Sequence, residues 1–465
     1  MLFHRLSSRA TMQKRKDVDM TQGSIVRHIL KFALPLLLGN LFQQLYNTVD
    51  TWVVGNYVGN DAFAAVGAVT PIVNMLIGAF TGLASGAGVV ISQFYGAGRH
   101  DRVKDTVHTA VSMTLILAVL FTAVGLLITP FMVSVTNVNE NSAGDATTYL
   151  SIYFSGLIGL MLYNMGAGIL RAVGDSKRPF YFLVVCALLN TGLDLLFVCF
   201  FRMGVEGVAL ATIISQFVSA ILVFWTLHRT SSCIKVEIKC LRLRWDLLRK
   251  ILFVGIPAGL QMALTAFSNV FVQSYINHFD EGLATSVYMS GWTSFLKVDS
   301  LLFLPVQSIA LAVTTFVGQN LGKGQVDRAK KGVTTALLIC LAIMVVLMIP
   351  LMIFAPWIVK LLNSTPEVIE SGTMYLRLLS PFYLLCCFNQ IYSCGLRGAG
   401  NSKAPMIIML ATFVGFRQLY LFIMSQICYE VIPIALGYPA GWLACCVTMT
   451  IYYHATRLDK KRLVS

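Results

Sequence analysis

Long apolar segments recur throughout the sequence, and they constrain its fold more than any other feature. A helix needs about 20 apolar residues to cross a bilayer. Twelve segments qualify: 29–56, 62–92, 107–135, 148–172, 178–201, 205–229, 249–279, 284–318, 332–360, 371–396, 404–428 and 434–457. Their apolar runs are continuous rather than alternating, which excludes a transmembrane β-barrel. The sequence therefore predicts an all-α polytopic membrane protein with twelve transmembrane helices.

The distribution of charge supports this fold class. Only 12% of the residues are charged, whereas a soluble domain carries about 25%. The net charge of +14 by itself would suit nucleic-acid binding. However, thirty of the 35 Lys and Arg residues lie in the tails and even-numbered connections or within three residues of them, and three lie in or near the odd-numbered connections (Arg202, Lys360 and Arg377). This positive-inside bias predicts that both termini are cytoplasmic. We expect a plasma-membrane location and no nucleic-acid partner.

The cysteines and histidines give no sign of a metal or cofactor site, and the N-terminal residues do not resemble a signal peptide. The eleven cysteines are scattered without a CxxC pair and the seven histidines have no metal-ligand spacing, so we expect no cofactor and no resident metal. The basic N-terminal residues lack the apolar core of a signal peptide. We expect residues 1–24 to be a disordered tail and residues 458–465 to be a basic C-terminal tail.

An internal repeat divides the chain into two halves. The motif Gln93-x-x-Gly96-x-Gly98-x-x-Asp101-Arg102 recurs 226 residues later from Gln319 to Arg328, and Leu170–Pro179 recurs at the same offset as Leu396–Pro405. The predicted lobes are 25–230 and 249–457, joined by a cytoplasmic linker at 231–248. Each lobe has six segments, so the two have parallel topology.

The repeated motifs also have structural interpretations. Two homologous bundles around a central cavity can rock between inward and outward openings, so the repeat predicts alternating access. Neither Gly-x-Gly loop follows a strand, so we interpret both as tight turns rather than phosphate sites. Gly78, Gly82 and Gly86 form a small-residue face for helix contact.

Among the 21 acidic residues, only Asp50, Asp194 and Asp299 lie well within the apolar segments. An aspartate at the centre of a membrane helix costs about 2.5–3.5 kcal/mol, which makes it a functional candidate. Asp50, Asp194 and Thr212 lie at a similar depth, about 10 Å from the outer ends of their segments. Two carboxylates in a low dielectric must share a proton or hold a cation. The predicted ion-coupling residues are Asp50, Asp194, Asn190, Asn164 and Thr212.

Two alternatives remain open for these acids. Each aspartate could simply accept a hydrogen bond from a neighbour. Asp299 and Lys297 are two residues apart and face different sides of a helix, so packing or gating suits them as well as coupling. At the repeat offsets, Asp50 aligns with Val272 and Asp194 with Tyr420. Because the second half lacks these acids, ion chemistry is expected in the first half only.

Several stretches together make the chain resemble the MATE (multidrug and toxic compound extrusion) transporter family. They are Leu34-Pro35, Tyr46–Thr51, Leu170–Asp175 and Val317–Gly322. The one-sided acids are similar to those of the DinF-like and MepA-like bacterial branch, which implies a coupling site in the N-terminal lobe. The NorM-like branch uses acids in segments 7 and 10, where this chain has Gln261 and no carboxylate.

The resemblance implies export of bulky, often cationic, organic compounds in exchange for H⁺ or Na⁺, with a transient Na⁺ possible at Asp50 and Asp194. The expected partners are small organic substrates, H⁺ or Na⁺, and the lipid bilayer, and the expected state is a monomer. Aromatic, Met and amide side chains suit a cavity that binds varied substrates. Each candidate taken singly could also be an ordinary residue of the packed core. The cavity candidates are Gln43, Tyr46, Asn47, Met161, Gln261, Asn269, Met289 and Trp292.

Three other functions fit the sequence less well: a flippase of the same broad architecture, a membrane enzyme and a receptor. A lipid or lipid-linked oligosaccharide flippase should carry several cations in its cavity, and only Lys297 and Arg417 lie near the middle of the apolar segments. A membrane enzyme would need acid–base constellations at the cytoplasmic ends of segments, which the sequence lacks, so no enzymatic activity is expected. The repeat disfavours a receptor for soluble ligands.

Overall fold

A computed structural model describes residues 18–135, 140–280, 286–458 and 462–464. This described part is almost entirely helical and contains no strand, which confirms the predicted all-α class. The first half comprises α2 (Ile25–Val53), η1 (Val54–Val58), α3 (Asn60–Gly96), α4 (His100–Val135), α5 (Glu140–Ser155), α6 (Leu157–Ala172), α7 (Lys177–Asp194), η2 (Leu195–Phe200) and α8 (Val205–Arg229). The linker contains the short turn η3 (Ile238–Cys240).

The second half repeats this order. It comprises α9 (Trp245–Asn277), η4 (His278–Asp280), α10 (Val287–Gly322), α11 (Val326–Leu362), α12 (Pro366–Leu379), η5 (Ser380–Phe382), α13 (Tyr383–Gly398), α14 (Lys403–Met409), η6 (Leu410–Phe416), α15 (Arg417–Ile427), α16 (Val431–Ala435) and α17 (Gly437–Ala455). The elements η1, η2 and η6 are π-helical continuations of the helices that they follow.

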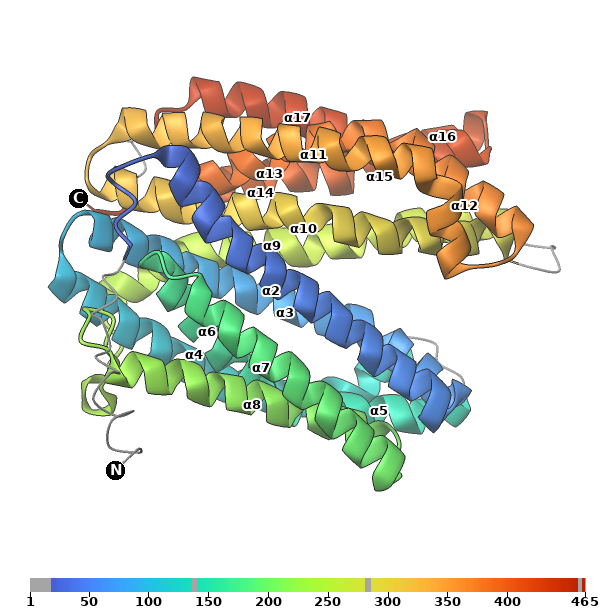
Figure 1. Cartoon of the computed structure of the whole chain (residues 1–465), viewed down its shortest axis with the longest axis horizontal. Helices are drawn as coiled ribbons and strands as arrows, with labels where there is room; N and C mark the ends of the chain where they lie inside the picture. Colours follow the sequence, from blue (N-terminus) through green and yellow to red (C-terminus); the bar gives the residue numbers. More distant parts are fainter. Residues whose placement is uncertain (1–17, 136–139, 281–285, 459–461, 465) are drawn as a thin grey trace, which may run out of the picture.

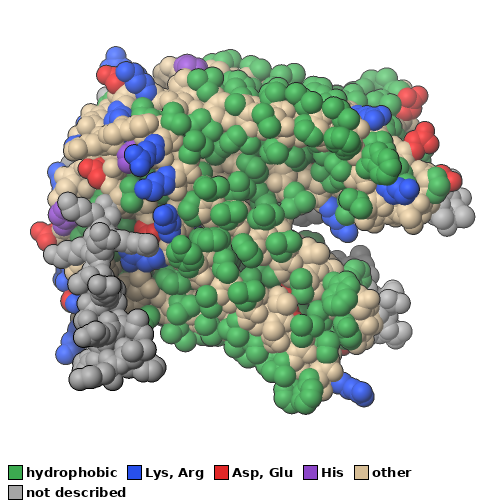
Figure 2. All heavy atoms as spheres, viewed as in Figure 1, with side chains coloured by type: hydrophobic (Ala, Val, Ile, Leu, Met, Phe, Trp, Pro, Cys, Tyr) green, Lys and Arg blue, Asp and Glu red, His purple; other side chains and the backbone are tan. Residues whose placement is uncertain are grey.

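The helices account for the twelve predicted segments. Among the described residues, ten helices are long and apolar enough to cross a membrane, and α5 with α6 forms an eleventh span bent by 48°. The remaining segment, the tenth (371–396), is interrupted by the 3₁₀ turn η5 around Pro381, so neither α12 nor α13 is long enough to span alone. Figure 2 shows hydrophobic side chains covering the outer face between the two ends of the molecule, as a lipid-facing surface requires.

Figure 1 shows the helices in two groups that follow the chain order, α2–α8 and α9–α17, which we call the N lobe and the C lobe. Helix α2 begins and α17 ends at the same end of the molecule, where Lys and Arg gather in Figure 2. We call this the basic end. The lobes meet there and separate toward the opposite end, where Figure 2 shows a hollow between them. The molecule is therefore closed at the basic end and open at the other.

Two helices cross between the lobes in equivalent ways. The first half of α2 packs into the C-lobe core through Ile29, Phe32 and Leu36, while α2 also packs along α7 of the N lobe. Correspondingly, Leu247 and Ile251 at the start of α9 belong to an N-lobe core cluster. Each first helix of a lobe is thus shared by both lobes, which the sequence repeat does not reveal.

A glycine seam joins α3 to α9. A Cβ atom on Gly82 would lie 2.2 Å from the Gly259 nitrogen, and one on Gly86 would lie 2.6 Å from the Gly255 Cα. No side chain fits at these distances, so the two backbones touch. This contact confirms the interpretation of Gly78, Gly82 and Gly86 as a helix-packing face.

The predicted disorder of residues 1–24 is wrong for the last seven of them. Residues 1–17 lie outside the described part, but Val18 N–H donates to the Val173 carbonyl and Met20 is 1% exposed. Met20 N–H donates to Gln319 Oε1 at 3.0 Å. The basic composition of the tail hid this contact because the attachment uses backbone groups and one buried methionine.

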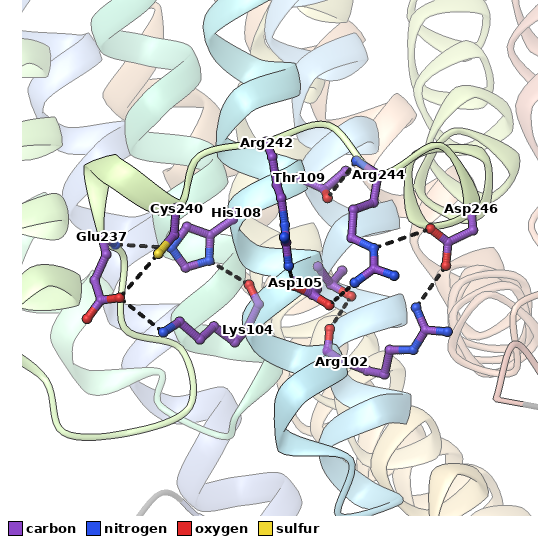
Figure 3. A network of polar contacts seen from close by, with 11 residues as sticks. Arg102, Lys104, Asp105, His108, Thr109, Glu237, Cys240, Arg242, Arg244 and Asp246 are labelled. Atoms are coloured by element: carbon purple, nitrogen blue, oxygen red, sulfur yellow. Dashed lines mark hydrogen bonds and ion pairs between the residues drawn. The ribbon is translucent and has the colours of Figure 1, made fainter.

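The linker between the lobes is fixed to α4 by a polar network (Figure 3). Lys104 Nζ lies 3.0 Å from Glu237 Oε2, and Arg242 lies 2.6 Å from Asp105. Arg102 Nη1 reaches Asp246 Oδ2 at the start of α9 at 2.8 Å. Hydrogen bonds from Lys104, Lys235 and Cys240 hold the pKa of the Glu237 carboxyl down at about 2. The basic linker is therefore an ordered brace between the lobes.

Candidate functional site: a carboxyl pair in the N lobe

The outer ends of α2 and α7 bring two of the predicted acids together. Asp50 lies in the last turn of α2, and Asp194 is the last residue of α7 before its π-helical continuation. The two helices pack against each other, and their carboxyl groups lie within hydrogen-bonding reach. Asp194 is completely buried, and Oδ1 of Asp50 is buried as well.

The contact between these carboxyls has a direct chemical consequence. A carboxylate is only an acceptor, so two of them can hydrogen-bond only when one carries a proton. Within the described residues, neither oxygen of Asp194 receives a hydrogen bond from any other N–H or O–H group. Two ionised carboxylates so placed would repel each other in a low dielectric. The pair therefore suits one shared proton or one small cation between its oxygens.

Asn190 completes the polar part of this pocket. It lies one turn before Asp194 and is 1% exposed. Both of its side-chain polar atoms are buried without a hydrogen-bond partner among the described residues. A buried amide left unsatisfied costs about 1–3 kcal/mol. The site thus holds unsatisfied oxygens on three side chains, the donor set that H⁺ or Na⁺ would use.

The two other predicted coupling residues are placed differently. Thr212 is 8% exposed, and its hydroxyl donates to the Val208 carbonyl of its own helix at 3.0 Å. The Asn164 amide donates to Leu160, also within its own helix, at 2.9 Å. Among the described residues, neither side chain makes a hydrogen bond with Asp50 or Asp194. Their participation in the site stays a prediction.

Aromatic residues that sequence reasoning missed stand around the carboxyl pair. Tyr149 of α5 is close enough to interact electrostatically with both aspartates, and Tyr153 stacks on Tyr149 with ring centroids 6.3 Å apart. Gln216 hydrogen-bonds to Tyr153. The sequence feature that could have predicted them is their i, i+4 spacing, which places both tyrosines on one face of α5. Tyr149 therefore places an aromatic ring beside the pair, and an apolar neighbour strengthens the electrostatic interaction between the two carboxyls.

The cavity candidates divide into accessible and buried groups. Asn47 is exposed, while Gln43, Tyr46 and Met289 are half-buried. Gln43 hydrogen-bonds to Tyr46, and Tyr46 also lies near Asp50. This part of α2 therefore presents a polar face next to the acid pair, since Gln43, Tyr46, Asn47 and Asp50 follow one another at i, i+3, i+4 and i+7.

Three other candidates lie in the core instead of on a cavity wall. Trp292 has no exposed surface and packs on Tyr375 and Tyr438, with ring centroids 5.2 Å away in each case. Met161 is 4% exposed within an N-lobe core cluster. Gln261 is 5% exposed and bonds to Arg397 and Met409. In this conformation none of the three is on an open cavity wall, and their role in substrate binding stays a prediction; core and pocket side chains look alike in sequence.

Asp299 and Lys297 do not pair. Tyr383 of α13 donates its hydroxyl to Asp299 Oδ1 at 2.7 Å. Lys297 is exposed on another face of α10, and no ion pair among the described residues involves it. The packing role considered for Asp299 thus has a visible basis, a tie between α10 and α13.

The C lobe carries a buried cation in the segment that corresponds to α7, the helix that carries Asp194 in the N lobe. Arg417 aligns with Thr191 at the 226-residue offset and is 1% exposed. It donates to Ser268 Oγ at 2.6 Å and to Asn269 Oδ1 at 3.0 Å. Its guanidinium also lies over the Tyr438 ring, 4.9 Å from the centroid. Asn269, a predicted cavity residue, is half-buried and serves here as an acceptor for this arginine.

Comparisons with known proteins agree with this architecture. A sequence profile of the MatE family matches residues 35–196 and 257–423. The chain is 29% identical to the "Probable multidrug resistance protein YoeA" of Bacillus subtilis, over 93% of this chain and 94% of that protein. It is 26% identical to the "FAD transporter" of Shewanella oneidensis, over 85% of this chain and 87% of that one.

Solved structures show the same fold. One is described as the "Outward-facing conformation of a multidrug resistance MATE family transporter of the MOP superfamily". It matches with a TM-score of 0.89 at 22% identity, over 97% of this chain and 99% of that one. A MOP superfamily transporter from Pyrococcus furiosus matches with the same TM-score, identity and coverage. At this level of identity, the likeness concerns the arrangement of helices.

Proposed function

The chain belongs to the MatE family of multi-pass membrane transporters, and we propose that it is a secondary antiporter that exports bulky, cationic organic compounds in exchange for H⁺ or Na⁺. The observation that carries this proposal is the contact between the Asp50 and Asp194 carboxyls. They lie in the N lobe only, inside a pocket whose polar atoms lack other partners. The names of the curated relatives support an organic substrate.

The placement of α2 suggests how ion binding changes the shape of the protein. One part of α2 is anchored in the C-lobe core and its other end carries Asp50 beside α7. Pro35 lies inside the helix, where its ring removes a backbone hydrogen bond and favours a bend. When a proton or cation neutralises the pair, the repulsion between α2 and α7 disappears. The end of α2 then moves relative to its anchor and changes the side to which the cavity opens.

The orientation follows from the same proposal. The basic end faces the cytoplasm, in keeping with the positive-inside rule, and the hollow between the lobes opens to the outside. The protein is a multi-pass plasma-membrane protein and works as a monomer. The twofold repeat supplies alternating access within one chain, so no second copy is needed to enclose a cavity.

The test is transport in reconstituted vesicles. Purified protein is inserted into liposomes, and uptake of a fluorescent organic cation is followed under an imposed pH gradient or Na⁺ gradient. We expect one of the two gradients to drive accumulation in wild type and neither to do so in Asp50→Asn. Gradient-driven transport at the wild-type rate in that variant would refute the proposed coupling site.

The flippase alternative is disfavoured by the state of the intramembrane cations. A diphosphate headgroup needs several free cationic side chains. Arg417 is buried and bonded to Ser268 and Asn269, and Lys297 is the other cation near the middle of a predicted segment. The same vesicles can test this alternative: scrambling of a fluorescent diphosphate lipid without cation transport would support the flippase.

A further inference from the structure

The repeated glutamines Gln93 and Gln319 make equivalent bonds at the closed, basic end. Gln93 is in α3 of the N lobe, and its Nε2 donates to the Gly398 carbonyl of the C lobe at 2.9 Å. Gln319 is in α10 of the C lobe, and its Nε2 donates to the Ala172 carbonyl of the N lobe at 3.0 Å. Both pairs are related by the 226-residue offset. Each amide therefore ties its own lobe to the matching helix end of the other lobe.

The side-chain oxygens of the same two glutamines bind the two chain tails. Gln319 Oε1 accepts the Met20 N–H at 3.0 Å. Gln93 Oε1 accepts the Leu463 N–H at 2.8 Å. The N-terminal and C-terminal tails are unrelated in sequence, yet they dock at equivalent places. Both glutamines have no exposed surface, so all of their bonding takes place inside the protein.

The glycines of the same motif explain why these bonds can form. A Cβ atom on Gly96 would lie 1.9 Å from the backbone carbonyl oxygen of Gln319. One on Gly322 would lie 2.0 Å from the backbone carbonyl oxygen of Gln93. Helices α3 and α10 therefore cross in backbone contact. At this crossing a glutamine side chain is long enough to reach the neighbouring lobe. The repeated Gln-x-x-Gly spacing therefore produces the same contact twice: once from the N lobe to the C lobe and once from the C lobe to the N lobe.

Further bonds hold each tail in place. On the N-terminal side, Asn320 and Arg328 donate to the Met20 carbonyl, and Lys323 donates to the Thr21 hydroxyl at 2.8 Å. On the C-terminal side, Lys250 bonds to the Leu463 carbonyl, and Arg462 donates to the Leu321 carbonyl at 3.2 Å. The C-terminal tail has fewer partners, so it should be released first.

We propose that Gln93 and Gln319 are a paired latch that keeps the basic end closed, with the two chain tails as its straps. The inference rests on the alternating access of the proposed function. Opening the basic end separates α3 from α10, which breaks both cross-lobe amide bonds. Because the same amides bind Met20 and Leu463, the tails leave when the end opens and return when it closes. The tails therefore set how often this end is open.

Hydrogen–deuterium exchange measured by mass spectrometry tests the latch directly on the purified full chain. The variants are Gln93→Met and Gln319→Met, which keep side-chain length and remove both polar atoms. We expect faster exchange in the released tail, the C-terminal one for Gln93→Met and the N-terminal one for Gln319→Met. The ends of α3 and α10 should also exchange faster in both. Each lost hydrogen bond should contribute roughly a 2- to 12-fold change.

A matched control uses a glutamine of the same tail outside the latch. Gln22 has an exposed side chain, so Gln22→Met should leave all of these rates within about twofold of wild type. Deleting residues 462–465 removes one strap without touching a helix, and it should reproduce the effect of Gln93→Met at the ends of α3 and α10. Helical content by circular dichroism confirms that each variant is folded.

The outcomes separate the latch from the proposed function. Unchanged exchange in folded Gln93→Met and Gln319→Met would overturn the latch, whether or not the vesicles transport cations. An equal effect of Gln22→Met would overturn it as well. Absence of ion-driven transport in wild-type vesicles would instead refute the antiport, because exchange at the basic end needs neither substrate nor ion.

Discussion

The two lobes share one fold but differ in the charge that they bury, acids in the N lobe and a cation in the C lobe. The N lobe has Asp50 and Asp194, buried in contact and with oxygens that lack other donors. The C lobe has Val272 and Tyr420 at the aligned positions. It carries Arg417 instead, whose guanidinium is bonded to Ser268 and Asn269. One lobe thus keeps acids with unused bonding capacity, and the other keeps a cation with assigned partners.

This difference decides which lobe can respond to ions. An arginine stays protonated at any physiological pH, so the C-lobe cluster cannot take up or release a proton. A carboxyl pair in a low dielectric can do so, because its second charge is costly. Both arrangements place expensive groups within the membrane. Gene duplication supplied two copies of the scaffold, and only one of them has a titratable pair.

The strongest test of the comparison removes one acid at a time. We expect Asp50→Asn and Asp194→Asn each to reduce gradient-driven transport of a fluorescent cation to the level of protein-free vesicles. An amide cannot change its charge, so ion binding no longer alters the repulsion between α2 and α7. Transport is measured as initial rate under an imposed pH or Na⁺ gradient.

The control is the third intramembrane acid. Asp299→Asn keeps an acceptor for the Tyr383 hydroxyl, so the variant should transport within about threefold of wild type. If Asp299→Asn abolished transport as completely as Asp50→Asn, ion coupling would not be confined to the N lobe.

The second test places an acid in the C lobe. Val272 aligns with Asp50 but is fully buried among apolar residues. Val272→Asp should lower the free energy of unfolding by about 3 kcal/mol or more, because the new carboxyl has no partner that corresponds to Asp194. Thermal unfolding in detergent measures the loss. Val272→Ala removes packing without adding a polar group, and an equal loss in both variants would refute the buried-charge explanation.

The third test removes the C-lobe cation. Arg417→Met loses two hydrogen bonds from a charged donor, worth about 1.5–3 kcal/mol each, and gains from no longer burying a charge. We expect a net destabilisation of about 1–2 kcal/mol and transport within about threefold of wild type. Arg417→Lys keeps the charge and a nitrogen donor, and it is the matched control. Loss of ion dependence in Arg417→Met alone would show that the C lobe takes part in coupling.

The sequence predicted the membrane class, the twelve segments and the carboxyl pair, for identifiable reasons. Apolar runs report directly on lipid contact, and buried acids such as Asp50 and Asp194 stand out because they are rare there. It could not distinguish core from cavity, as Trp292 and Met161 show, since both environments select the same apolar side chains. It also missed the docking of Met20, which depends on backbone hydrogen bonds that any residue type could make.

The smallest expected difference concerns the repeated Asp-Arg loops at the basic end. In the N lobe, Arg102 reaches Asp246 and its neighbour Lys104 reaches Glu237. In the C lobe, the equivalent Arg328 donates to the carbonyls of Met20 and Gly23 instead. Carboxylates titrate and carbonyls do not. The ion pairs of the N-lobe loop should therefore respond to pH, whereas the bonds of Arg328 should not.

The pH range follows from Glu237, whose pKa is held at about 2 by hydrogen bonds from Lys104, Lys235 and Cys240. A glutamate in the unfolded chain titrates near ~4.3. Because folding depresses the pKa, the stabilisation by Glu237 is complete above that value and disappears as pH falls through about 2. We expect Glu237→Gln to lower the melting temperature by about 1 °C at pH 5–8, as for other exposed ion pairs.

A control variant outside the linker and the pH dependence of the difference test this prediction. Glu370→Gln removes an exposed carboxylate from the second turn of α12, far in sequence from the linker, and should leave the melting temperature unchanged. The difference between wild type and Glu237→Gln should vanish as the pH approaches 2, where the wild-type carboxyl is protonated too. A difference that persisted there would mean that shape rather than charge holds the linker on α4. The two loops would then be equivalent braces despite their different partners.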